Sequence, residues 1–171
     1  MNKEEIDKII FGFGVNSFNR FPAFLKINSQ LKGENYWYAL RNSYVNSDNL
    51  YSFSKMIKKC FLKNEPQIES LMLPVEMEYF NNLPNQITIY RGMTEDELNQ
   101  KAFGCSWTLK KEVAEYFAYT YNRNFDTRNI NKVVHELTIN KNEVIAFFNE
   151  REEFEIIYIK TKTINNAPSN K

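Results

Sequence analysis

The spacing of apolar residues changes near Pro84, and this change constrains the fold more than any other feature. Before it, apolar residues recur every three or four positions, as in Leu50, Phe53 and Ile57, which is the spacing of one helix face. After it, short segments such as 132–139 alternate between apolar and polar residues, as half-buried strands do. Helices followed by strands around one internal helix predict an α+β domain.

We predict a single domain with a helical lead-in at 1–84, a β-rich core at 85–160 and a frayed tail at 161–171. A chain of 171 residues is long enough to form a core with a cleft. Inside the β-rich part, 109–121 has the pattern of a helix, and Thr108 is a suitable N-cap for it. The expected helices span 3–13, 21–33, 33–45, 49–64 and 68–85, the last broken near Pro74, and the expected strands span 86–92, 102–108, 132–139, 143–149 and 153–160.

Charge and hydropathy exclude several classes of protein. The formal net charge is only +1, so no strong field draws the chain to nucleic acid or to an anionic membrane. No stretch reaches the 18 or more apolar residues of a membrane span, and no export signal is visible. We therefore expect a cytoplasmic protein that does not act at a membrane. The abundance of Asn, Lys and Ile fits a bacterial or phage origin.

Cysteine and histidine usage argues against a metal site. Cys60 and Cys105 do not have the spacing of metal ligands, and we expect two buried free thiols. His135 is the single histidine, so a site with several histidine ligands is excluded. It lies in an alternating segment, and we expect a strand residue without a chemical role.

Two short segments in the β-rich part place polar side chains at strands. In "ITIYRG", the strand is expected to end at Arg91, whose guanidinium can bind a phosphate, and Gly92 allows backbone to approach a ligand closely. In "SWT", Ser106 and Thr108 share one strand face and Trp107 takes the other. An internal Arg–carboxylate pair and a serine satisfied by backbone are the plain alternatives.

The third segment, "REEFEIIYIK", sets two carboxylates against an apolar strand. On an extended strand, Glu153 and Glu155 point to the same face, and burial raises the pKa of at least one such carboxyl. Pairs of this kind occur at active sites and also at exposed strand starts, where they oppose aggregation. The order of Arg, then Ser-x-Thr, then Glu-x-Glu along the chain favours a site.

With these residues in this order, the sequence resembles the Arg-Ser-Glu class of mono-ADP-ribosyltransferases, which includes cholera-toxin-like and binary-toxin-like enzymes and many bacterial and phage proteins. The matching residues are Arg91, Ser106 and both glutamates of "EFE", all within 86–160. Trp107 stands where the family usually has Thr. The His-Tyr-Glu class of these enzymes fits less well, because its histidine comes first in the chain, whereas His135 follows Arg91 and Ser106.

The resemblance implies an ADP-ribosyltransferase-like fold, with a mixed β core of two small sheets around an NAD cleft. It also implies that NAD is the substrate, that nicotinamide is released and that no metal is needed. Glu155 would stabilise the cationic transition state, Ser106 would orient Glu155, and Arg91 would bind the NAD phosphates. The other NAD contacts that the resemblance implies involve Gly92, Trp107, Thr108 and one of two aromatic residues, Tyr116 or Phe117.

The resemblance also bears on the acceptor of ADP-ribose. Glu153 stands where arginine-modifying members have a second Glu, which implies protein arginine as the acceptor and 147–152 as the loop that meets it. RNA or DNA is the alternative acceptor, through basic segments such as 54–63 and 122–128. A third interpretation is a catalytically inactive binding module on the same fold, neutralised by a partner; the intact Arg, Ser and Glu residues disfavour it. An antitoxin or a regulatory protein is a further candidate for a binding partner.

Overall fold

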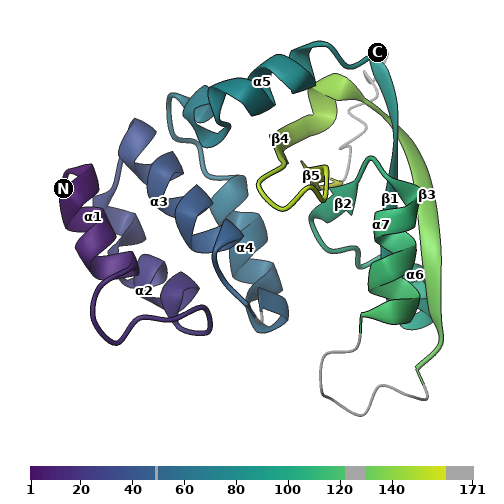
Figure 1. The fold of residues 1–171 in the computed structure, drawn as a ribbon, viewed down its shortest axis with the longest axis horizontal. Helices are drawn as coiled ribbons and strands as arrows, with labels where there is room; N and C mark the ends of the chain where they lie inside the picture. The colour runs from purple at the N-terminus through teal and green to yellow at the C-terminus, as the bar shows by residue number, and fades with distance from the viewer. Residues whose placement is uncertain (49, 122–129, 161–171) are drawn as a thin grey trace, which may run out of the picture.

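The computed structural model describes residues 1–48, 50–121 and 130–160, and it shows an α+β arrangement, as predicted (Figure 1). Helices before Asn82 form one half of the molecule, and strands beginning at Gln86 form most of the other half. The predicted tail at 161–171 and the basic segment 122–128 lie outside the described residues. No helix within the described ranges combines the length and the apolar character that crossing a bilayer would require.

The helical half contains the predicted helices, but most are shorter than predicted: the helix expected at 3–13 ends at Ile10, the one expected at 21–33 ends at Ile27, and the one expected at 49–64 is a short turn followed by a helix that ends at Phe61. Its longest helix, α3, covers the aromatic-rich segment at the predicted bounds and buries Tyr36, Trp37 and Leu40. The predicted break near Pro74 is confirmed: a short turn ends at Leu71, and a new helix begins at Pro74, whose missing N–H costs nothing in the first turn. The elements of this half are α1 (Lys3–Ile10), α2 (Arg20–Ile27), η1 (Asn28–Gln30), α3 (Gly33–Val45), η2 (Leu50–Phe53), α4 (Ser54–Phe61), η3 (Ile68–Leu71) and α5 (Pro74–Asn81).

The strands form one five-stranded antiparallel sheet, where two small sheets were expected. Its order is β3-β1-β2-β5-β4. β1 and β2 share a single pair, Tyr90 opposite Thr108, which joins a long β3–β1 ladder to a compact β2–β5–β4 ladder. The two ladders therefore form one sheet with a weakly paired seam. The strands are β1 (Gln86–Thr94), β2 (Ser106–Thr108), β3 (Lys132–Asn140), β4 (Val144–Phe148) and β5 (Glu155–Tyr158).

The core is divided between the two faces of the sheet. Ile156 and Ile157 are neighbours on β5, so their side chains point to opposite faces, and each enters a different apolar cluster. The cluster with Ile157 includes most of the buried helical residues, whereas the cluster with Ile156 includes Trp107 and Phe147. Glu155 lies on the same face of β5 as Ile157 and therefore faces the helical half.

Local structure around the internal helix differs from the prediction. The expected helix 109–121 consists of α7 (Lys111–Glu115) and a π-helical turn, η4 (Tyr116–Thr120). Thr108 is not its N-cap. Lys110 holds that position, and the Thr108 hydroxyl accepts a hydrogen bond from the Lys110 N–H at 3.0 Å. The structure also contains a helix that was not predicted, α6 (Glu95–Gln100), and a short turn, η5 (Lys141–Glu143).

A buried ion pair ties the helical half to the segment that leads to β5. Arg41 on α3 lies 2.8 Å from the carboxylate of Glu76 on α5, and both side chains are almost fully buried. Arg41 also contacts Glu150 at 3.1 Å, and Glu76 accepts the backbone N–H of Asn149 at 2.8 Å. These contacts fix the start of 149–154, the loop between β4 and β5.

Breaking this buried pair should be costly. We expect Arg41→Met to lower the free energy of unfolding by about 3–5 kcal/mol, because it leaves the Glu76 carboxylate buried without its cation. The matched control is Lys8→Met, which breaks the exposed pair between Lys8 and Glu4 and should change stability by less than about 0.5 kcal/mol. Urea unfolding of both variants measures the difference. Equal losses would show that the Arg41 pair does not anchor the loop.

Candidate functional site

A cavity of about 380 Å³ opens along the seam between the two ladders. Its size is within the usual range for small-molecule sites. It is lined by Tyr51, Tyr90, Arg91, Gly92, Ser106, Trp107, Thr108, Val113, Ala114, Phe117, Tyr121, Glu153 and Glu155. The three sequence signals, which are far apart in the chain, thus meet at one cavity.

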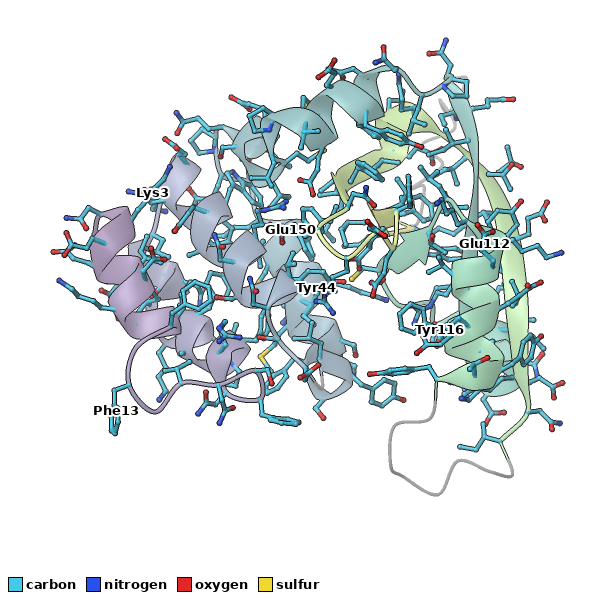
Figure 2. The ribbon with its side chains drawn as sticks, in the orientation of Figure 1. Lys3, Phe13, Tyr44, Glu112, Tyr116 and Glu150 are labelled. Carbon is cyan, nitrogen blue, oxygen red and sulfur yellow. The ribbon has the colours of Figure 1, made fainter. Side chains whose placement is uncertain are left out.

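The Glu155 carboxylate is held by hydroxyl groups from both halves of the molecule. Glu155 is the first residue of β5 and is half-buried. The Ser106 hydroxyl, from β2, lies close enough to the carboxylate to act as a donor and to lower its pKa. The hydroxyl of Tyr44, from α3, donates a second hydrogen bond to Glu155 Oε1 at 2.7 Å. Figure 2 shows Tyr44 on the side of the helical half that faces the sheet.

The environment of Glu155 raises the pKa of its carboxyl group. Burial is the largest cause and raises its pKa, and the nearby charge of Glu153 raises it further. The hydrogen bonds from Ser106 and Tyr44 and the charge of Arg151 act in the opposite direction and lower the pKa. The net result is a raised pKa at a carboxyl group in a cavity, which is a common property of reactive sites.

Glu153 lines the same cavity as Glu155, but not by the predicted route. It precedes β5, and Phe154 between them has φ +49°, so the alternation of an extended strand does not apply. The backbone carbonyl of Glu153 accepts a hydrogen bond from Thr108 Oγ1 at 2.7 Å. At the other end of the loop, the guanidinium of Arg151 donates to the carbonyl of Val45. The two carboxylates are thus brought together by an anchored turn.

Arg91 lies within β1, not at its end, and its guanidinium makes internal contacts. Nε donates to Glu97 Oε1 at 2.8 Å and Nη1 donates to the Ser106 carbonyl at 2.7 Å. Nη2 lies against Gly104, where a Cβ would approach it to 2.4 Å. Arg91 therefore joins β1, α6 and β2 along the cavity. Because arginine has five N–H donors, these two bonds leave others for a ligand.

Gly92 is needed because a helix packs against it. A Cβ at this position would lie 2.4 Å from the carbonyl oxygen of Ala114 and 2.8 Å from the N–H nitrogen of Ala118. The backbone of α7 and of the π-helical turn therefore rests directly on β1. Close approach of backbone was predicted at Gly92, but the group that approaches in the structure is this helix.

The aromatic residues of the π-helical turn divide between the cavity and the surface. Phe117 lines the cavity, with Tyr121 beside it at a ring-centroid distance of 5.4 Å. Tyr116 is about half exposed and is not among the residues that line the cavity. Of the two candidates, Phe117 is therefore the one positioned to contact a ligand. Tyr51, from the helical half, also lines the cavity and is 86% exposed.

The side chain of Trp107 lies mainly in the core beneath the cavity. It is 2% exposed and packs edge-on against Phe103 at 5.7 Å. His135 on β3 stacks on the same Phe103 ring at 5.3 Å, so it is a packed strand residue outside the cavity. Cys60 and Cys105 are both buried free thiols, as predicted, and burial raises the pKa of Cys105 to about 11.

Sequence analysis did not identify three residues that shape the site. Tyr44 and Tyr51 belong to the helical half, for which the sequence predicted helices but no site residue. Glu97, which binds Arg91, belongs to the unpredicted helix α6. That helix carried a usable signal, because Thr94 followed by Glu97 is the spacing of a capping box, and Thr94 Oγ1 does accept the Glu97 N–H at 3.1 Å.

Comparisons of the chain with protein-family models, with curated proteins and with solved structures gave no match. Within residues 1–48, 50–121 and 130–160, no group of three or more His, Cys, Asp or Glu side chains could hold a metal ion. What the cavity can do must therefore be inferred from its own side chains: two carboxylates, one anchored arginine, hydroxyl groups and an aromatic wall.

Because the pKa of Glu155 is raised in the folded state, ionisation of its carboxyl group lowers the stability of the protein. Between the ordinary carboxyl pKa and the raised one, the folded state keeps a proton that the unfolded state has released, so stability falls as the pH rises through this interval. We expect Glu155→Gln to raise the melting temperature near pH 7.5, and this gain should fade as the pH drops below about 4.3.

Thermal unfolding across this pH range measures the effect. Glu115→Gln is the control, because this exposed carboxylate on α7 lies outside the cavity and its loss should leave the melting temperature nearly unchanged. If Glu155→Gln instead lowered the melting temperature at neutral pH, the prediction that the charge of Glu155 destabilises the folded state would be contradicted.

Proposed function

We propose that this protein is an NAD-dependent mono-ADP-ribosyltransferase that moves ADP-ribose to a macromolecular acceptor, protein arginine in the first instance, and releases nicotinamide. One observation supports this proposal most: the Glu155 carboxylate is fixed by Ser106 inside a cavity that a second carboxylate, Glu153, also lines. The resemblance of the Arg, Ser and Glu-x-Glu segments to this enzyme class agrees with that geometry.

The proposed reaction needs a fixed negative charge. The bond between the nicotinamide nitrogen and C1′ of its ribose breaks, and both bonding electrons leave with nicotinamide. The ribose becomes cationic in the transition state, and a carboxylate beside it lowers the barrier, as in glycoside hydrolysis. Glu155 has this role in our proposal, and the Ser106 and Tyr44 hydroxyl groups would hold the carboxylate in place.

The second carboxylate serves the acceptor. An arginine guanidinium is a poor nucleophile while it is protonated, because its pKa exceeds 12. Glu153 would hold the guanidinium and take one proton as a guanidine nitrogen attacks C1′, which balances the charge of the step. The anchored loop 149–154 presents Glu153 at the cavity, so the acceptor would approach along this loop.

The residues that line the cavity suggest how the remaining parts of NAD would be bound. Phe117 would cover the nicotinamide ring, and backbone at Gly92 would bind its amide. Arg91 would contact the phosphates through the N–H groups that Glu97 and Ser106 leave free. Thr108 and the backbone of Trp107 would complete the wall.

A nucleic-acid acceptor is the second candidate, and one observation favours it. The ring of Tyr51 is 86% exposed at the rim of the cavity, and exposed aromatic rings can stack on unpaired bases. Incubating the protein with labelled NAD and cell lysate, followed by separate protease and nuclease treatments, distinguishes the acceptors. Label lost to protease supports a protein acceptor, and label lost to nuclease supports RNA or DNA.

Substitutions of Glu155 and of Glu153 should have different effects on NAD hydrolysis and on transfer of ADP-ribose. Glu155→Ala should bring both NAD hydrolysis and transfer close to background, because the charge that stabilises the cation is gone. Glu153→Gln should reduce transfer to an arginine acceptor by about 10²–10⁴-fold, the usual effect of a general base, while hydrolysis largely persists. Nicotinamide release with and without acceptor measures both activities.

Circular dichroism of each variant confirms folding before the assay. Equal loss of hydrolysis in the two variants would refute the division of labour between Glu153 and Glu155. Full transfer activity in Glu155→Ala would refute the enzyme assignment itself. A wild-type protein that binds NAD without releasing nicotinamide would support an inactive binding module instead.

A further inference from the structure

A tyrosine of the helical half makes direct contact with the carboxylate at the centre of the site. Tyr44 is the penultimate residue of α3 and is 6% exposed. Its ring packs edge-on against Phe61 at 5.1 Å and lies 6.1 Å from Phe148, so its position is set by the core. From there its hydroxyl donates to Glu155 Oε1 at 2.7 Å.

The surroundings of the Tyr44 hydroxyl keep it protonated. Burial and the adjacent Glu155 charge raise the pKa of Tyr44 well above its ordinary value, so it remains a protonated donor. The Ser106 hydroxyl lies near both groups and lowers the pKa of each, and with its single proton it can donate to Glu155 while Tyr44 does the same. The carboxylate is therefore held between a donor on β2 and a donor on α3, two elements that belong to different halves of the fold.

We infer that Tyr44 is a positioning residue for Glu155: its hydroxyl, buried in the helical half, fixes the orientation of the carboxylate and favours its ionised form. For catalysis this role rests on the proposed function, since an ionised Glu155 matters there as the charge opposite the ribose cation. The contact itself rests only on geometry. It gives the helical half a direct part in the site, beyond support of the sheet.

Other charged or titratable groups also face Glu155 and must be kept constant in a test. Glu153 and Arg151 face it from the loop, with opposite effects on its pKa. Cys105, just before β2, is close enough for Glu155 to raise the pKa of the thiol. Substituting only the Tyr44 hydroxyl leaves all of these in place.

The test is Tyr44→Phe, which removes the hydroxyl and keeps the ring in the core. We expect NMR titration of the Glu155 carboxyl carbon to show a higher pKa than in the wild type, because a hydrogen bond to the charged form is lost. We expect the acidic limb of the kcat/KM profile for nicotinamide release to move to higher pH in parallel. On that limb, activity should fall roughly tenfold, and the plateau should fall less.

Tyr36→Phe is the matched control. Tyr36 lies on the same helix, is fully buried and donates its hydroxyl to the Cys60 carbonyl at 2.9 Å. Its loss should cost stability without moving the titration of Glu155. Replacing Tyr44 with 3-fluorotyrosine, a stronger donor of similar shape, should lower the pKa of Glu155 and keeps the test decisive if the Phe variant folds poorly.

The outcomes separate this inference from the proposed function. A Glu155 titration that is unchanged in Tyr44→Phe, or that moves equally in Tyr36→Phe, would overturn the positioning role. A wild-type protein that releases no nicotinamide would overturn the proposed enzyme activity, while the NMR titration would still decide whether Tyr44 controls Glu155.

Discussion

A carboxylate held partly out of water is the constraint on which the arrangement of this protein depends. Glu155 begins a strand whose next three residues are buried, so water alone cannot solvate its charge. Hydroxyl groups replace part of that water: Ser106 comes from the sheet and Tyr44 from a helix near the N-terminus. The Glu155 carboxylate thus lies where the helical half meets the sheet, and it lines the cavity at that place.

The seam in the sheet makes room for this cavity. β1 and β2 share a single pair, Tyr90 opposite Thr108, so the two ladders part on either side of it. Arg91 on β1 binds Glu97 on α6 and the Ser106 carbonyl on β2, and Gly92 lets α7 and the π-helical turn pack directly on β1. These contacts set the positions of Arg91, Gly92 and Phe117 in the wall of the cavity.

The sequence carried the periodic features of the fold and several of the residues that line the cavity from its β-rich part. Alternation and helical spacing predicted the α+β class, and the order of Arg91, Ser106 and Glu155 predicted which residues meet. The approach of Tyr44 was not predictable, because a contact over 111 residues leaves no local pattern. The turn before β5 was missed because its left-handed residues, Glu152 and Phe154, are not glycines.

The long stretch of chain between Tyr44 and Glu155 determines when the contact between them can form. Contacts between remote residues form late in folding, after local helices and hairpins, because closing a long loop costs entropy before any contact rewards it. During synthesis the helical half is made before Glu155, so a nascent chain has Tyr44 without the carboxylate that it contacts. The hydrogen bond between Tyr44 and Glu155 therefore forms only after β5, the last strand of the described residues, has been made and has joined the sheet.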